Sequence, residues 1–371
     1  WPRRLRGISR AAKMGGTNKE ESMSESVFRE LARALDRLAN GFPQTESEIE
    51  LRLLQKIFSS EEAGLASKLG GQMEPVERIA ERVGAPVREL RPRLLKMVKR
   101  GMVLFEDRQG SPHFRLAPFI VGIYEAQVDA MDEELAHLFE EYMAEGGAAG
   151  IMSPEPAIQR VIPAQRAVKE EWILPYDDVR LLLEKANTFT VQPCICRKER
   201  ALVGSPCDFP LDVCLGFSSR VRAPREGDLT REQALALLDK CEEIGLVHSV
   251  SNIQEGLGYL CNCCGCAILR YVNEQGIESS VAQANYIAAI DPEECQGCGE
   301  CSERCQVQAI EERDGVFTVK EDRCIGCGLC VTGCSHDAAK LHRKPEEQIL
   351  HPPEDFSVWE KERLRNRGLP E

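Results

Sequence analysis

The chain has 371 residues, 43% of them hydrophobic and 29% charged, which is typical of a globular protein with two or three domains. Its formal net charge of −13 argues against a general affinity for nucleic acid. No stretch approaches about 18 consecutive apolar residues, so no transmembrane helix is expected.

The N-terminal residues 1–26 contain no apolar periodicity and begin with Trp rather than Met. Arg3 and Arg4 resemble a twin-arginine signal, but no apolar segment follows them. We therefore expect residues 1–26 to be a disordered tail or a mis-assigned start. Residues 27–40 predict an amphipathic helix that ends before Gly41.

Residues 46–118 predict a series of helices closed by a hairpin. Helical patterns cover 46–59, 61–69, 75–84 and 86–100, and extended runs follow at 102–107 and 112–118. This order resembles a winged-helix domain. The resemblance implies DNA binding through the helix at 86–100, because residues 75–115 carry ten Lys/Arg against five Asp/Glu. A docking or dimerisation module is the alternative, and Pro92 is unusual in a recognition helix.

The segment 118–145 shows apolar residues at helical spacing, which predicts one long amphipathic helix for packing or dimerisation. The Gly-rich run 146–150 follows it and is the expected domain boundary. Four prolines in 151–175 predict an extended segment. Together, 27–145 is expected to form the N-terminal domain.

Residues 151–288 predict a small α/β domain. Helices are expected at 177–186, capped by Asp177, and at 231–244, with strands at 188–192 and 246–252. Two groups of thiols lie in this region and are candidate metal ligands: Cys194, Cys196, Cys207 and Cys214, then Cys261, Cys263, Cys264 and Cys266.

Three interpretations of these eight thiols remain open. They could hold a further iron–sulfur cluster, a structural zinc ion, or a redox-active disulfide through Cys263 and Cys264. Their spacing matches no single motif, so the sequence does not divide them into ligand sets. Cys241 and His248 are expected to be buried core residues rather than ligands.

The strongest motif lies at 295–334, where the spacing C-x2-C-x2-C-x3-C occurs twice. Glycines between the thiols allow a tight loop to wrap a [4Fe–4S] cubane, and the fourth Cys of each run ligates the other cluster. We therefore assign Cys295, Cys298, Cys301 and Cys334 to one cluster. The second receives Cys324, Cys327, Cys330 and Cys305.

Residues 291–340 resemble a bacterial ferredoxin of the two-[4Fe–4S] type. One departure is that Gln306 and Ser335 stand where this family usually has Pro after the fourth Cys. The alternative interpretation, two zinc ribbons, is disfavoured because it needs paired C-x2-C knuckles rather than two runs of four cysteines. Cluster thiolates require reducing conditions, so we expect a cytoplasmic protein of an anaerobic cell.

The arrangement of 150–360, with QPCICR, PCDFPLDVCLGF, GYLCNCCGC and the ferredoxin repeat, resembles a group of 4Fe–4S binding proteins of anaerobic bacteria. The expected fold is α+β and multidomain, with a winged-helix-like domain, the α/β Cys-rich domain, a ferredoxin-like domain at 289–343 and a C-terminal tail at 344–371. The resemblance implies cluster binding and electron transfer.

We therefore expect an electron carrier or a subunit of an anaerobic oxidoreductase, with a redox protein as its partner. No Ser/His/Asp set or nucleotide-binding loop indicates a stand-alone enzyme. The alternative is a redox-responsive transcription regulator with DNA as the partner. The sequence leaves the oligomeric state open, a dimer included.

Overall fold

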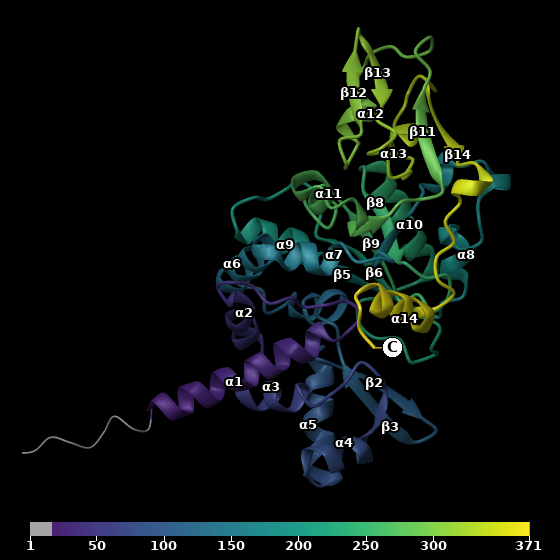
Figure 1. The fold of residues 1–371 in the computed structure, drawn as a ribbon. Coiled ribbons are helices and arrows are strands. Elements are labelled where there is room, and N and C mark those ends of the chain that lie inside the picture. The colour runs from purple at the N-terminus through teal and green to yellow at the C-terminus, as the bar shows by residue number, and fades with distance from the viewer. Residues whose placement is uncertain (1–16, 371) are drawn as a thin grey trace, which may run out of the picture.

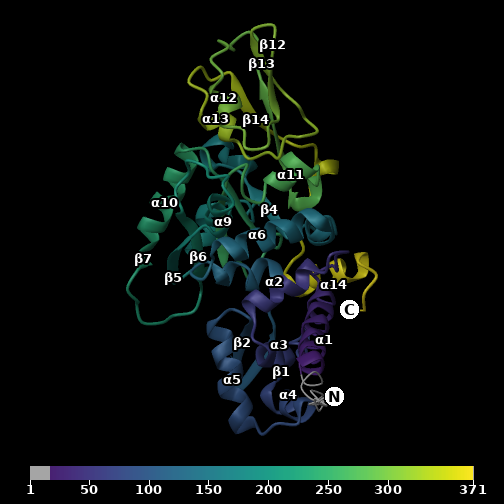
Figure 2. The same cartoon turned by 90° about the vertical axis from the view of Figure 1, so that its left-hand side faces the viewer.

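The computed structural model describes residues 17–370, and side chains from residue 25 onward. The chain forms three parts in a row, with the N-terminal helices and hairpin at one end and the residues of the two cysteine runs at the other (Figures 1 and 2). One continuous cluster of buried hydrophobic side chains extends through all three parts. In the described part of the chain, no helix is both long and apolar enough to cross a membrane.

The first helices pack against one another around Leu31, Leu35 and Leu54, which are almost completely buried. Helix α1 begins at Thr17, ten residues earlier than predicted, and ends at Asp36. Its N-terminal turns therefore include part of the segment expected to be a tail. The bounds are α1 Thr17–Asp36, α2 Ile49–Ile57 and α3 Ser60–Ala66.

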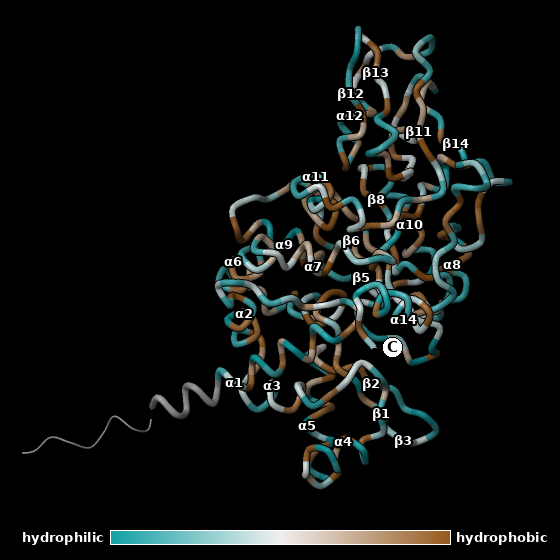
Figure 3. Tube along the Cα trace, in the orientation of Figure 1, coloured by the Kyte–Doolittle hydropathy of each residue, from teal (hydrophilic) through white to brown (hydrophobic). Residues whose placement is uncertain are grey.

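The next unit has the order strand, helix, helix, strand, strand: β1 Glu74–Pro75, α4 Val76–Val83, α5 Val87–Lys99, β2 Val103–Arg108 and β3 Ser111–Leu116. The strands form an antiparallel sheet in the order β1-β3-β2. Gln109 and Gly110 both have positive φ in the two-residue turn, which suits the twist of a hairpin. Helix α5 buries Leu90, Leu94 and Met97, so hydrophobic and hydrophilic residues alternate along it (Figure 3).

The prediction of one long helix over 118–145 was wrong. Only α6, Glu133–Tyr142, is a regular helix in this segment, and Asp132 caps it by accepting a hydrogen bond from the N–H of Leu135. Upstream, Ile120, Val121 and Gly122 have non-helical backbone angles. Ile120 is buried and Val121 partly buried because they pack against the core between the parts, and a cap within the segment sets the start of α6.

The middle part is built on a seven-stranded sheet in the order β10-β4-β8-β9-β6-β5-β7. All neighbouring strands are antiparallel except β10 and β4. The expected α/β arrangement, which implies a mainly parallel sheet, is therefore corrected to α+β. The strands are β4 Gln159–Ile162, β5 Thr188–Pro193, β6 Asp212–Ser218, β7 Asp228–Leu229, β8 Val247–Ser251, β9 Tyr259–Cys263 and β10 Val281–Ala282.

The middle part also contains five α-helices, of which α10 packs against the sheet and α8 against α10: α7 Ala148–Met152, α8 Val179–Glu184, α9 Ile195–Leu202, α10 Arg231–Glu243 and α11 Arg270–Gln275. Thr230 and Gln233 form a capping box at the start of α10. Helix α8 is capped by Asp178 and not by Asp177, because Asp177 is buried and paired with Arg160.

The cysteine runs lie in two matching halves. Strand β11, Tyr286–Ile290, pairs with β14, Ala339–Arg343, and β12, Ile310–Arg313, pairs with β13, Val316–Val319. Each run of thiols continues into a short helix, which is α12, Glu300–Glu303, or α13, Leu329–Thr332. The β12–β13 hairpin forms the far tip of the molecule (Figure 1).

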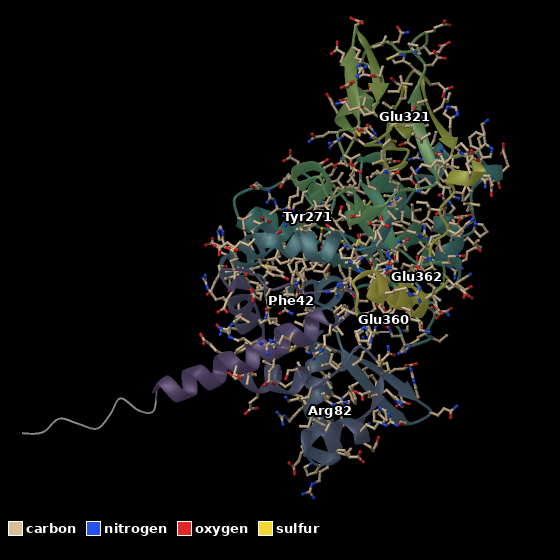
Figure 4. The ribbon with its side chains drawn as sticks, in the orientation of Figure 1. Phe42, Arg82, Tyr271, Glu321, Glu360 and Glu362 are labelled. Carbon is tan, nitrogen blue, oxygen red and sulfur yellow. The ribbon has the colours of Figure 1, made fainter. Side chains whose placement is uncertain are left out.

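Residues 344–371 are not a simple tail. Helix α14, Phe356–Asn366, returns to the N-terminal part, where Trp359 and Leu364 are buried. The carboxylate of Glu360, labelled in Figure 4, lies 3.4 Å from the Arg115 guanidinium on β3. Arg363 is fully buried and donates hydrogen bonds to four backbone carbonyls, those of Ala39, Ile151, Pro154 and Pro156.

Candidate metal centres

The loops of both cysteine runs depend on glycine for space. At Gly326, with φ of 70°, a Cβ would lie 2.3 Å from the carbonyl oxygen of Tyr286. At Gly297, with φ of 66°, it would lie 2.5 Å from the carbonyl oxygen of Gly315. Both loops therefore require glycine for the backbone angle and for the close approach of a second backbone segment.

The first predicted ligand set comes together at the outer end of the molecule. Its four thiols line one small hollow with the side chains of Ile290 and Phe317; these thiols are Cys295, Cys298, Cys301 and Cys334. Cys334 reaches this hollow from the second run, as the crossed assignment requires. Cys298 is exposed and Cys301 is buried, so the hollow opens toward solvent on one side.

The second predicted set lies deeper. Cys330 is close enough to interact electrostatically with its three predicted partners, Cys305, Cys324 and Cys327. Burial raises the pKa of the Cys327 thiol to about 12 and also raises that of Cys330. A buried thiol of this kind loses its proton when a metal ion binds to its sulfur and takes the place of that proton.

The spacing of the ferredoxin-type thiols fits clusters rather than single ions. Among residues 25–370, only one group of three or more Cys, His, Asp or Glu ligand atoms lies within 4.8 Å of one another, and it contains none of these eight thiols. Thiolates around a single zinc ion would be about 3.8 Å apart, given Zn–S bonds of about 2.3 Å. A bound [4Fe–4S] cluster would supply reversible one-electron chemistry here.

We call the first set, Cys295, Cys298, Cys301 and Cys334, the outer set and the second set, Cys305, Cys324, Cys327 and Cys330, the inner set. Gln306, the residue after Cys305, holds the inner set against the middle part. Its Oε1 accepts a hydrogen bond from the N–H of Gly265 at 2.7 Å, and its Nε2 donates to the carbonyl of Gly245 at 2.9 Å. The backbone carbonyl of Gln306 accepts from the Asn273 amide at 2.9 Å. Because Gly265 lies between Cys264 and Cys266, Gln306 joins one ligand of the inner set to the middle thiols.

Further hydrogen bonds to the middle part hold the inner set from another side. The N–H of Ala164 donates to the carbonyl of Cys327 at 2.8 Å, and the N–H of Ala284 donates to that of Ile325 at 3.0 Å. Arg304 also donates to the carbonyls at the end of α10, those of Glu242 and Glu243. The inner thiols therefore lie at the junction between the middle part and the part that carries the cysteine runs.

The eight middle thiols divide into two groups, and strand geometry explains the division. Side chains alternate along a strand, so Cys261 and Cys263 of β9 face the same side. Cys264 and Cys266 follow the strand end and turn away from that side. Cys214 on β6 lies opposite Cys261, because Leu215 pairs with Leu260 in the antiparallel register.

The first group has five members, which line a cavity of about 270 Å³. Their thiols interact in a continuous series: Cys194 with Cys196 and Cys214, and Cys261 with Cys214 and Cys263. The Nε2 of Gln159 lies 3.7 Å from the Sγ of Cys261. We call this group, Cys194, Cys196, Cys214, Cys261 and Cys263, the cavity thiols.

Two carboxylic acids, Glu125 and Glu199, and the guanidinium of Arg270 also line the cavity, which is mainly apolar. Burial raises the pKa of Glu125 to about 7 and that of Glu199 to about 9. Arg270 lies 3.3 Å from the Glu199 carboxylate and 2.5 Å from that of Glu140. Sequence reasoning missed these residues, since no motif connects segments so distant in the chain.

The second group contains Cys207, Cys264 and Cys266, whose Sγ atoms all lie within 4.8 Å of one another. The Sγ of Cys264 is 4.0 Å from that of Cys207 and 2.8 Å from that of Cys266. The Cys266 thiol and, after it, the Arg197 guanidinium lower the pKa of Cys264 to about 6, although burial opposes them. We call these three the compact thiols.

Arg197 lies between the two groups. It is 2% exposed, its Nε lies 3.3 Å from the Sγ of Cys264, and it also interacts electrostatically with Cys194. Of the two residues expected to be core rather than ligand, Cys241 is fully buried in α10, and His248 is buried with its Nδ1 at 2.5 Å from the Asn262 side-chain oxygen.

Comparison with known proteins identifies one part of the chain. Residues 288–341 match the family model of a 4Fe-4S dicluster domain, which implies two [4Fe–4S] clusters and a role in electron transfer for this domain. No curated protein and no solved structure matches the chain.

Proposed function

We propose that this protein transfers electrons between an external redox protein and a metal centre in its cysteine-rich middle part. The contact between Gln306 and Gly265 carries this proposal, because it connects the segment of Cys305 to the end of strand β9, which holds the cavity thiols Cys261 and Cys263. A ferredoxin that acted alone would need no such connection. The proposal rests on the two clusters that the dicluster match implies.

The outer thiols are the proposed entry point. Cys298 is exposed, whereas Cys324 and Cys330 of the inner set are buried. Exposed carboxylates surround the outer loop, namely Glu293, Glu294, Glu300 and Glu303. An acidic surface attracts a basic partner and steers its approach, so we propose a redox protein with a basic docking face.

A basic c-type cytochrome can serve as an artificial electron acceptor in the test. We expect the chemically reduced protein to reduce it rapidly at low salt, and the rate to fall as salt screens the attraction. Double substitution Glu293→Lys and Glu300→Lys should slow the reaction by about tenfold or more. The control is Glu77→Lys, an exposed change at the other end of the molecule. Equal slowing by the control would overturn the proposed entry point.

A second function is favoured by one surface. Helix α5 presents exposed basic side chains outside the stripe formed by its buried Leu90, Leu94 and Met97; these are Arg88, Arg91, Arg93, Lys96 and Lys99. The neighbouring β2–β3 hairpin extends beside the helix (Figure 1). A winged-helix domain that reads DNA would use a basic helix and a hairpin in this way.

This regulator function is tested by binding to random duplex DNA and to genomic fragments over a range of salt concentrations. Binding that weakens steeply with salt and with Arg91→Glu would support it. The control is Arg37→Glu on the N-terminal side of the molecule. Absence of binding at low salt, in both cluster oxidation states, would leave electron transfer as the single proposed function.

A further inference from the structure

We propose that the cysteine-rich part holds two separate metal centres of different kinds: an iron–sulfur cluster at the cavity thiols and a single ion at the compact thiols. This inference specifies the metal centre invoked by the proposed function, and it depends on that function only for the role of the cluster. The ligand sets themselves are argued from geometry.

The first step is that the two groups are separate sites. All five cavity thiols line the cavity, whereas none of the compact thiols does. The three compact sulfurs approach one another within 4.8 Å, and no cavity thiol belongs to that group. The chain passes from one site to the other between Cys263 and Cys264, where strand β9 ends.

The second step concerns the compact thiols. The Sγ of Cys264 lies 4.0 Å from that of Cys207, close to the about 3.8 Å expected between thiolates around one zinc ion, and 2.8 Å from that of Cys266, a distance that must open by about 1 Å when the ion binds. Four irons and four sulfides need more room than these sulfurs leave. With three protein ligands, the fourth position belongs to an exogenous ligand such as water. Zinc suits such a thiolate site because it is borderline-soft and has no preferred geometry of its own.

The third step concerns the cavity thiols. Five thiols exceed what one tetrahedral ion can bind, and they surround about 270 Å³ of space rather than meeting at a point. Thiols in this number favour an occupant that is thiophilic and larger than one ion, and the dicluster match already implies [4Fe–4S] clusters elsewhere in the chain.

The order of the sulfur contacts identifies the central ligands. The contacts run Cys196, Cys194, Cys214, Cys261, Cys263, so every set of four consecutive thiols contains the middle three. Cys194, Cys214 and Cys261 are therefore assigned as ligands, and either Cys196 or Cys263 is the fourth. The Gln159 amide donates to the sulfur of Cys261, and the Ser249 hydroxyl shares a hydrogen bond with the sulfur of Cys263, an arrangement that tunes bound clusters.

The test begins with metal and acid-labile sulfide analysis of the full chain, purified without oxygen. We expect about twelve iron and about one zinc per chain, of which about eight iron belong to the dicluster domain. Mössbauer spectra of the intact protein should show all the iron in [4Fe–4S] clusters. About eight iron in total would overturn the cavity cluster, whether or not the cytochrome assay supports electron transfer.

Cysteine variants then separate the two sites. Cys214→Ala and Cys261→Ala should lower the iron content from about twelve to about eight and leave the zinc unchanged. Cys207→Ala and Cys266→Ala should remove the zinc and leave about twelve iron. Loss of both metals from every one of these variants would overturn the separation.

The control for these variants is Cys241→Ala, since Cys241 is fully buried in α10 and belongs to neither group. It should retain every metal. Comparison of Cys196→Ala with Cys263→Ala identifies the fourth cluster ligand, and full retention of iron by both would overturn the cavity cluster. If a variant fails to fold, X-ray absorption at the zinc edge of the intact protein decides whether three sulfur ligands surround the ion.

Discussion

The side-chain oxygen of Gln306 accepts a hydrogen bond from the backbone N–H of Gly265 over 2.7 Å. The two residues are 41 positions apart, and each lies next to a cysteine of a different metal-binding region. A proline, which usually follows the fourth cysteine in two-cluster ferredoxins, would make no such bond. The substitution thus replaces a rigid turn with a link between two parts of the chain.

We expect Gln306→Leu to loosen this link without removing a ligand. Two side-chain hydrogen bonds are lost, which should lower the free energy of unfolding by about 1–3 kcal/mol. Hydrogen exchange of the Gly265 amide should become faster, and all the iron should be retained. Gln296→Leu is the control, because Gln296 is exposed and bonds only to a neighbouring carbonyl. Unchanged exchange at Gly265 would contradict the role of Gln306.

We expect Gly326→Ala to prevent normal loading of the inner cluster. The added methyl group would lie 2.3 Å from the carbonyl oxygen of Tyr286, so a strand or the cysteine loop must move. Gly84→Ala is a matched control, since Gly84 has a similar φ of 69° but nothing within 4 Å of its Cβ position. The control should cost about 1 kcal/mol of stability and no iron. Equal iron content in both variants would show that the loop tolerates the methyl group.

We expect Arg363→Leu to destabilise the protein by about 3 kcal/mol or more. The change leaves four carbonyls without their donor, and two of them, those of Ala39 and Ile151, are buried. Thermal unfolding under anaerobic conditions would measure the loss. Lys361→Leu, on an exposed position of the same helix, should change the midpoint little. Similar thermal unfolding midpoints for the two variants would mean that water donates hydrogen bonds to these carbonyls in place of the guanidinium.

Asp177 provides a prediction for pH. It is 5% exposed, one carboxylate oxygen accepts a hydrogen bond from Arg160 at 2.8 Å, and the other has no partner within the described chain. Burial raises its pKa to about 6, with Arg160 opposing. The folded state therefore binds more protons than the unfolded state between the two pKa values, so this contribution to stability is present at low pH and is lost as the pH rises through about 6.

We accordingly expect the stability of the wild type relative to Asp177→Asn to fall by about 1.4 kcal/mol from about pH 5 to about pH 8. Urea denaturation followed by tryptophan fluorescence would measure this difference. Asp129→Asn, a change at an exposed position, should give no such slope. A slope of the opposite sign for Asp177→Asn would mean that Arg160 dominates and lowers the pKa.

The sequence was most informative where local spacing determines structure. The two cysteine runs, the β2–β3 hairpin and the helices from 76 to 99 could be predicted because their turns and periodic residues are close in the chain. The prediction of one helix over 118–145 was wrong because Ile120 and Met131 are apolar residues of the shared core and do not lie on one face of a common helix. Periodicity does not distinguish these two causes.

The division of the middle thiols was only partly predictable. Alternation along a strand separates Cys261 and Cys263 from Cys264, and this much follows from the sequence once the strand is recognised. The approach of Cys207 to Cys264 depends on how β6, α9 and β9 pack, which no local pattern specifies. The antiparallel order of the middle sheet could not be predicted for the same reason, since its strands are short and their partners are remote in sequence.

The burial of Arg363 also has a consequence for biosynthesis. Its acceptor at Ala39 precedes it by 324 positions, so at usual translation rates this carbonyl waits on the order of tens of seconds for its donor to leave the ribosome. Every candidate metal-binding cysteine, from Cys194 to Cys334, is translated before α14. The nascent chain can therefore receive iron and sulfide before α14 emerges, and the contact of α14 with Ala39 forms afterwards.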